Sequence, residues 1–332
     1  MGELNSELIC KATGASAIVG SEKLQSLWSG CGEIVRVFLN DGLFDSIIVK
    51  HIKLPEQIAH PRGWNSKRAH QRKWRSYQVE CHWYQHYAKH CPEQSPLPEC
   101  LGVLQNEHEI YLLLSDLRLA GFSEVKNKLT VDELRACLNW LASFHANFMQ
   151  QSAPELWPIG CYWHLETRPD ELAALADTQL KNAAAAIDKK LSSARFQTLV
   201  HGDAKLANFC FSGAAQTNSQ TRVAAVDFQY VGRGCGIKDV AYFLGSCLNE
   251  QECEELAEAL LDDYFLALNR ALESSQPTLD RQALNREWRA LYAYAWADFQ
   301  RFLLGWSPGH WKINTYSQTL TKQVLQQLGK YH

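Results

Sequence analysis

The sequence predicts an α+β protein of two lobes, in which a small lobe of antiparallel strands precedes a larger helical lobe. Two runs rich in β-branched residues, 27–40 and 44–54, flank the turn sequence NDG, which is typical of an antiparallel hairpin. Helical periodicity dominates the chain after Leu117. We therefore expect a strand-rich lobe over 1–116 and a helical lobe over 117–332.

One helix and two further strands complete the predicted small lobe. Over 75–90, apolar residues recur at three- and four-residue steps, as they do on one face of a helix. Three prolines follow directly and end this helix. Two short apolar runs, at about 100–104 and 110–115, then predict the last strands of the lobe.

The larger lobe begins with a long helical stretch at 129–149. Thr130 followed by Glu133 has the pattern of a capping box, in which two side chains satisfy free backbone N–H groups at a helix start. Only 199–229 reads as strand, loop and strand, with the polar sequence SGAAQTNSQT as its hairpin turn. Further long helical stretches are expected at 170–191, 251–273 and 281–304.

Composition excludes several classes of protein. The chain has 332 residues, of which 46% are hydrophobic and 21% charged, with a formal charge of −3, so no nucleic-acid or membrane partner is expected. Eleven cysteines include no C-x-x-C pair, which indicates free thiols in a reducing compartment. No apolar run approaches the roughly 18 residues of a membrane span, and the first residues do not resemble a signal peptide. We expect a cytoplasmic location.

A polar cluster of fixed short spacing lies in the sequence LVHGDAKLANFCF, at 199–211. Phosphoryl transfer needs a carboxylate to orient or deprotonate the attacking hydroxyl, and further oxygen ligands to hold Mg²⁺ on the phosphates. Asp203, Asn208 and Asp227 supply these groups at the expected spacing. Any one of them alone would be read as an ordinary capping or turn residue. Their joint spacing favours a phosphotransfer site.

The motif H-G-D-x-x-x-x-N followed by VDFQ resembles the signature of the aminoglycoside phosphotransferase and choline kinase branch of the protein-kinase-like fold. Within that branch, VKHI, the Glu-containing helix, LLLSDL followed by AGF, HGD and VDFQ most resemble the ecdysteroid-kinase-like group. The similarity covers nearly the whole chain. It implies a kinase-like two-lobe fold and an enzyme that uses ATP and Mg²⁺.

The resemblance and the chemistry together give roles to the polar cluster. Asp203 is expected to act as the catalytic base, with Lys205 near the transferred phosphate and His201 as an orienting residue. Asn208 and Asp227 are the expected Mg²⁺ ligands. In the resembling family a comparable Asp follows the VDFQ turn, at Asp239 here, and we expect it to brace the catalytic loop by accepting backbone N–H bonds.

The small lobe offers the remaining parts of a nucleotide site. Lys50, at the end of the second hairpin strand, is placed to reach the α- and β-phosphates, and Glu80 on the following helix is the expected ion-pair partner that aims it. Both residues can also be read as surface charges, and Glu93 is a less favourably placed alternative to Glu80. No P-loop motif occurs in the chain, which argues against the other large nucleotide-binding class.

Two backbone regions are further candidates for nucleotide binding. Gly30 and Gly32 would form a glycine-rich lid over the nucleotide, or a bare tight turn. Ser115 and Leu117 lie where the lobes join, so the resemblance implies that their backbone groups bond the adenine edge.

Two other patterns have simpler explanations. His82, His86 and His90 would share one helix face, but without a strong third ligand type they favour a solvated face over a metal site. The stretch 62–75 carries six Lys or Arg and no acid. It is better explained as an exposed insert than as a nucleic-acid or anionic-substrate contact.

The predicted function is an ATP- and Mg²⁺-dependent kinase that phosphorylates a hydroxyl of a small molecule. Aromatic residues in 292–311 and 157–164 favour an apolar or aromatic alcohol as acceptor, although packing of the helical core would explain them equally well. The alternatives are a choline- or aminoglycoside-type kinase and a pseudokinase-like nucleotide-binding module. A protein-substrate kinase is disfavoured because no A-P-E element follows VDFQ.

Overall fold

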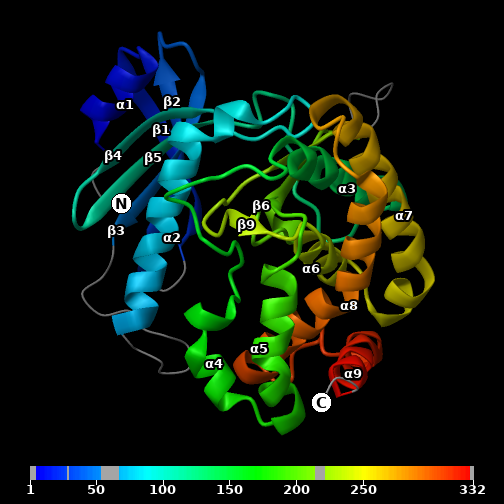
Figure 1. Ribbon diagram of the computed structural model, residues 1–332. Helices are drawn as coiled ribbons and strands as arrows, with labels where there is room; N and C mark the ends of the chain where they lie inside the picture. The colour runs from blue at the N-terminus through cyan, green and yellow to red at the C-terminus, as the bar shows by residue number, and fades with distance from the viewer. Residues whose placement is uncertain (1–4, 28–29, 54–66, 214–220, 330–332) are drawn as a thin grey trace.

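A twisted sheet packed on one long helix adjoins a larger set of helices in the computed structural model, which describes residues 5–27, 30–53, 67–213 and 221–329 (Figure 1). The sheet lobe is drawn in blue to cyan, and the helical lobe in green to red. This is the α+β, kinase-like arrangement that the sequence predicts. The division at residue 116 stays a prediction.

The small lobe is a five-stranded antiparallel sheet in the order β1-β2-β3-β5-β4. Residues of α1 and α2 cover its two faces, because Ile9 belongs to the apolar cluster on one side and Tyr77 to the cluster on the other. The central strand β3 is therefore buried on both faces. The elements are α1 Ser6–Thr13, β1 Ala17–Ser26, β2 Gly32–Asn40, β3 Ser46–Lys53, α2 Lys67–His86, β4 Cys100–Gln105 and β5 Glu109–Ser115.

The predicted hairpin is confirmed as β2 and β3, and the predicted strands at 100–104 and 110–115 as β4 and β5. The sequence did not reveal α1 or β1. Nearly all β1 side chains are exposed, so this edge strand lacks the alternation of apolar residues that marks a half-buried strand. The helix predicted over 75–90 begins earlier, at Lys67, and its last predicted turn is a short 3₁₀ helix, Ala88–His90.

The larger lobe contains the predicted capping box, since Thr130 and Glu133 bond each other's backbone N–H groups at the start of α3. The single helix predicted at 170–191 is wrong. It is two helices, because Asp177 caps a new helix by accepting the N–H of Leu180. None of the described helices is long and apolar enough to cross a membrane. The helices are α3 Val131–Asn147, α4 Pro169–Ala174, α5 Thr178–Ser192, α6 Ile237–Cys247, α7 Glu250–Ser275, α8 Arg281–Trp306 and α9 Thr315–Gly329, with a 3₁₀ turn at Leu165–Thr167.

Four very short strands frame the polar cluster in place of the two predicted at 199–229. The strand β6, Thr198–Val200, pairs with β9, Gly232–Gly234, and β7, Phe209–Phe211, pairs with β8, Val223–Ala225. Most of the predicted hairpin turn between β7 and β8, at 214–220, lies outside the described residues. The catalytic loop runs from β6 to β7, and VDFQ lies between β8 and β9. Each small ladder therefore joins one end of the catalytic loop to one end of the VDFQ segment.

The segment between α2 and β4 packs on the larger lobe, although the chain returns to the sheet of the small lobe directly after it. The carbonyl of Pro96 accepts the indole N–H of Trp140 at 2.9 Å and the backbone N–H of Ala225 at 3.1 Å. Ser95 donates its hydroxyl to the carbonyl of Trp140 at 2.9 Å. The two lobes are thus connected by this segment as well as by the chain at Asp116.

Candidate functional site

The loop that follows β6 has a backbone conformation that requires glycine. Gly202 adopts φ +77°, and a side chain there would lie 2.1 Å from the carbonyl oxygen of Tyr230. The carboxylate of Asp239, in the first turn of α6, accepts the backbone N–H of His201 at 2.6 Å and that of Gly202 at 3.0 Å. The bracing contact expected of Asp239 is therefore confirmed.

Asp203 is a buried carboxylate in this loop. Its Oδ2 accepts hydrogen bonds from Nζ of Lys205 at 3.0 Å and from Nδ2 of Asn208 at 3.3 Å, and Asn208 also bonds the Asp203 carbonyl at 2.8 Å. Within the described residues Oδ1 lacks a well-formed hydrogen bond, and the Tyr242 hydroxyl is a side-chain donor that interacts with this carboxylate. Asp203 is thus a buried acceptor that its own loop holds in place.

His201 lies beside Asp203 and orients the loop. Its Nδ1 accepts the N–H of Asp203 at 3.3 Å, so the proton of the neutral ring lies on Nε2, which donates to the carbonyl of Val226 at 3.0 Å. The ring also packs on Phe228, with centroids 4.5 Å apart. Since both ring nitrogens are used internally, His201 holds the catalytic loop and VDFQ together.

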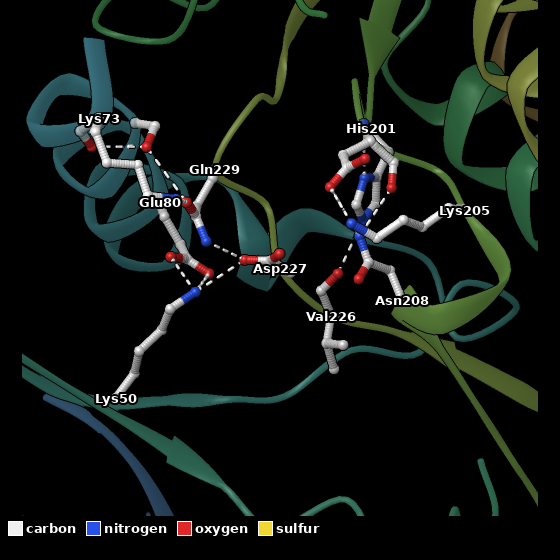
Figure 2. A network of polar contacts seen from close by, with 11 residues as sticks. Lys50, Lys73, Glu80, His201, Lys205, Asn208, Val226, Asp227 and Gln229 are labelled. Atoms are coloured by element: carbon white, nitrogen blue, oxygen red, sulfur yellow. Dashed lines mark hydrogen bonds and ion pairs between the residues drawn. The ribbon is translucent and has the colours of Figure 1, made fainter. Parts of the chain in front are cut away.

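Lys50 bridges the two lobes through two carboxylates (Figure 2). Its Nζ lies 2.7 Å from Oε2 of Glu80 on α2 and 2.8 Å from Oδ1 of Asp227. Burial disfavours the ammonium form, but Asp227 and Glu80 outweigh that effect and raise the pKa of Lys50 above its ordinary value. Glu93, the alternative partner, is exposed and lies in a turn beyond α2.

Asp227 has a strained backbone, and its carboxylate bonds both Lys50 and Gln229. Its φ is +70°, a conformation that non-glycine residues rarely adopt and that tends to mark functional positions. Against the effect of burial, the charge of Lys50 holds the pKa of Asp227 well below its ordinary range. Figure 2 shows its second oxygen on the side of Asn208.

The donor set of Asn208 and Asp227 fits Mg²⁺ bound mainly through a substrate. No group of three or more His, Cys, Asp or Glu in the described part of the chain could hold a metal by itself. Mg²⁺ usually takes one or two protein oxygens and completes its shell with phosphate oxygens and water, which matches these two side chains. The alternative of a histidine metal site is not supported; the rings of His82 and His86 lie with their centroids 4.4 Å apart, tilted by 38°.

Sequence reasoning missed a second lysine at this site. Nζ of Lys73 bonds Oε1 of Gln229 at 2.8 Å, and Nε2 of Gln229 bonds Oδ1 of Asp227 (Figure 2). The ammonium also lies 4.5 Å from the ring centre of Tyr77. Gln229 in VDFQ was the available signal, because a buried glutamine that donates to Asp227 needs a partner for its carbonyl. Lys73 thus adds a positive charge beside Lys50.

The described part of the basic stretch 62–75 is not an exposed insert, and that interpretation is wrong for 67–75. These residues form the first turns of α2. Arg72 and Arg75 donate to the backbone carbonyls of Thr167 and Glu155, at 2.6 and 2.7 Å. Residues 54–66 lie outside the described residues.

Gly30 lies between β1 and β2, and Gly32 is the first residue of β2. Gly30 donates to the carbonyl of Leu27 at 3.2 Å, and Gly32 accepts the N–H of Leu27 at 2.8 Å. A side chain on Gly32, whose φ is +125°, would lie 2.0 Å from the carbonyl oxygen of His51. The glycines therefore permit a tight turn against β3; whether the turn also covers a nucleotide stays a prediction.

The connection between the lobes is held by Asp116, which accepts Nε of Arg36 at 2.7 Å and the hydroxyl of Ser46 at 2.8 Å. The N–H of Ser115 donates to Glu99, and the carbonyl of Leu117 accepts two N–H groups of the following turn. No hydrogen bond from the Leu117 N–H is found among the described residues. The contact of Ser115 and Leu117 with the edge of adenine stays a prediction.

The predicted aromatic segments meet next to the catalytic loop. The rings of Trp163 and Tyr242 lie 4.7 Å apart, and each lies within 5.0 Å of Phe299. All three are buried, so much of this cluster packs a small core of its own. Burial and the nearby carboxylate of Asp203 raise the pKa of Tyr242, which connects the cluster with the base.

Solved structures share the fold. The choline kinase of Cryptosporidium parvum Iowa II superposes with a TM-score of 0.52 at 9% identity, over 94% of this chain and 89% of that chain. An aminoglycoside 2'-phosphotransferase in its GDP complex gives 0.49 at 12% identity, over 97% of both chains. An aminoglycoside phosphotransferase from Streptomyces rimosus gives 0.47 at 12% identity, over 86% of this chain and 96% of that chain. At such identities the likeness shows the fold alone.

The two-lobe fold, with Asp203, Asn208 and Asp227 gathered between its lobes, defines a kinase-like phosphotransferase. The family model described as "Ecdysteroid kinase-like family" matches residues 59–157 and 159–276, which is more than half of the chain. The chain belongs to the ecdysteroid kinase-like family, as the resemblance predicted. Comparison with curated proteins gives no match.

Proposed function

We propose that this protein is an ATP- and Mg²⁺-dependent kinase that transfers the γ-phosphate to a hydroxyl of a small molecule. One observation carries the proposal: the buried carboxylate of Asp203 lies in the same site as Asn208, Asp227 and the Lys50–Glu80 pair. A base, a metal-binding pair and a phosphate-binding lysine are the parts that in-line phosphoryl transfer requires.

Asp203 orients the acceptor hydroxyl and receives its proton as the oxygen attacks the γ-phosphorus. The new P–O bond forms while the bond to the β,γ-bridging oxygen breaks, so the products are the phosphorylated acceptor and ADP. Lys205, 3.0 Å from Asp203, stabilises the charge on the transferred group. Against burial, Asp203 and Asp227 raise the pKa of Lys205, which keeps it charged.

Asn208 and Asp227 would hold Mg²⁺, which when bound neutralises phosphate charge and orients the donor. Before nucleotide binds, Lys50 shares Oδ1 of Asp227. Glu80 holds the ammonium beside Asp227, so Lys50 can turn to a phosphate oxygen without leaving its partner.

The aromatic residues near Asp203 support an acceptor with an apolar or aromatic face. Tyr242, Trp163 and Phe299 form one wall close to the base. Flat apolar surfaces bury well against such rings, whereas a polycationic sugar would need a wall of carboxylates.

The test is ADP release from ATP and Mg²⁺ in the presence of sterols, aromatic alcohols, choline and aminoglycosides, with product detection by mass spectrometry. Asp203→Asn should fold normally and lose at least about 100-fold in kcat. Turnover confined to aminoglycosides would overturn the apolar acceptor. Binding of ATP without turnover of any alcohol would favour the pseudokinase-like module instead.

A further inference from the structure

The loop between α8 and α9 places a lysine inside an aromatic cage next to the catalytic loop. Nζ of Lys312 lies 4.9 Å from the ring centre of Tyr242, 5.6 Å from that of Phe299 and 5.5 Å from that of Trp311. Tyr242 comes from α6 and Phe299 from α8, so three separate elements build the cage. Such rings hold cations by their negative faces.

The ammonium in this cage has no ion-pair partner among the residues that the structure describes. Besides burial, Cys247 and Asp203 act on it in favour of the ammonium form, and Lys205 opposes that form. Burial outweighs Cys247 and Asp203 and lowers the pKa of Lys312 to about 8. The backbone of Lys312 is fixed by its N–H to Nδ1 of His310 at 3.2 Å and by its carbonyl, which accepts from Ser317 at 3.2 Å.

A cage of this kind next to a catalytic base would suit the cationic head of an amino alcohol, yet the protein fills it with its own cation. A second ammonium group could enter only by displacing the first or by lying against it, and both are unfavourable at low dielectric. An uncharged head group of the same shape meets no such repulsion.

We propose that Lys312 is the residue that excludes cationic acceptors from this site, so that the enzyme selects uncharged alcohols over amino alcohols. This inference rests on the proposed function for the identity of the site, but the occupancy of the cage can be measured without catalysis.

Choline and 3,3-dimethyl-1-butanol test it directly, because they have the same shape and differ in charge. Binding of each is measured by calorimetry without nucleotide for wild type, Lys312→Met and Lys312→Arg. We expect Lys312→Met to bind choline about 30-fold more tightly than wild type, the gain of one buried cation–π contact, with 3,3-dimethyl-1-butanol changed less than threefold. Lys312→Arg keeps the charge and should bind choline as weakly as wild type.

Equal gains for both probes in Lys312→Met, or a gain of choline binding in Lys312→Arg, would overturn the inference. Tight choline binding by the wild-type protein would also overturn it. If choline binding responds as expected but no variant releases ADP with any alcohol, the inference about the cage holds and the proposed kinase function fails. The melting temperature of each variant is measured, and the wild-type choline affinity above and below pH 8 provides a second test without any substitution.

Discussion

The carboxylate of Asp239 accepts the backbone N–H of His201 at 2.6 Å, and through that bond the first turn of α6 fixes the loop that carries Asp203. The other oxygen bonds the N–H of Gly202, and His145 lies 3.2 Å away. One side chain therefore satisfies two buried backbone donors that nothing else in the loop reaches.

Asp239→Asn should leave one of these donors facing an amide NH₂ group. We expect a loss of about 1–3 kcal/mol in the free energy of unfolding and a fall in kcat of at least about tenfold, because Asp203 is no longer held in place. Urea titration and steady-state kinetics measure the two effects. A fall in stability without a fall in kcat would contradict the positioning role.

Glu80→Gln should weaken nucleotide binding, because Lys50 loses one of its two carboxylate partners and is drawn to Asp227 alone. We expect KM for ATP to rise about tenfold, with little change in the melting temperature. Glu93→Gln is the matched control, since Glu93 is exposed and was the alternative in the sequence. Equal effects of the two substitutions would refute the assignment.

Lys73→Met should raise KM for ATP severalfold and leave the acceptor KM unchanged, since its ammonium lies near Asp227 and Gln229 on the nucleotide side of the site. Lys89→Met, at an exposed position just beyond α2, controls for the loss of a positive charge. ATP-binding isotherms recorded without acceptor separate the effect on ATP binding from any effect on acceptor binding. An unchanged ATP affinity would remove Lys73 from the site.

Sequence alone was sufficient to place Asp203, Asn208 and Lys50, because short spacings fix their relation to a strand or a loop; the roles of these residues stay predictions. It was insufficient for Lys73 and Lys312, whose partners come from distant parts of the chain. Gln229 is 156 residues from Lys73, and no local pattern encodes such a contact. Tertiary packing brings these lysines to the site.

The helices and strands were likewise predicted correctly where neighbouring residues determine them, and missed where distant residues do. The capping box at Thr130 is local, and its prediction is correct. The break between α4 and α5 depends on Asp177, which continues a helical pattern in sequence but caps the second helix in the structure. The edge strand β1 is stabilised by its pairing with β2, so its own residues carry little signal.

Gly32→Ala should destabilise the small lobe by about 3 kcal/mol, because the new methyl group would lie 2.0 Å from the carbonyl oxygen of His51 and φ is +125°. Gly309→Ala is the control, since a side chain there meets no atom within 4 Å and its φ is ordinary. Thermal unfolding of both variants checks the difference. Similar melting temperatures for the two variants would contradict the prediction that a side chain does not fit at Gly32.

Choline affinity of the wild-type protein should rise with pH. With a pKa of about 8, the Lys312 ammonium fills the cage below that pH and loses its charge above it. The groups that face it are Asp203 and Lys205 from the catalytic loop, Cys247 from α6 and His310 from its own loop. Burial raises the pKa of Cys247 to about 12, so this thiol stays neutral over the range.

The stability of the folded protein should also rise with pH. The folded pKa of Lys312 lies below its ordinary value of 10.5, so the charged lysine costs stability at neutral pH, and this cost fades between pH 8 and 10.5. Lys312→Met should therefore melt at a higher temperature than wild type at pH 7, with the advantage shrinking above pH 8. A constant difference at all pH values would show that the charge is not the cause.

The hydrogen bonds that the Pro96 carbonyl accepts from Trp140 and Ala225 have a consequence for cooperativity. The chain leaves the sheet after α2, packs on the larger lobe, and only then returns to form β4 and β5. Neither lobe can melt without withdrawing buried partners from the other, so calorimetry should record one transition rather than two. A fragment ending at residue 116 would likewise lose the surface on which its own segment 92–98 packs, and it should not fold alone.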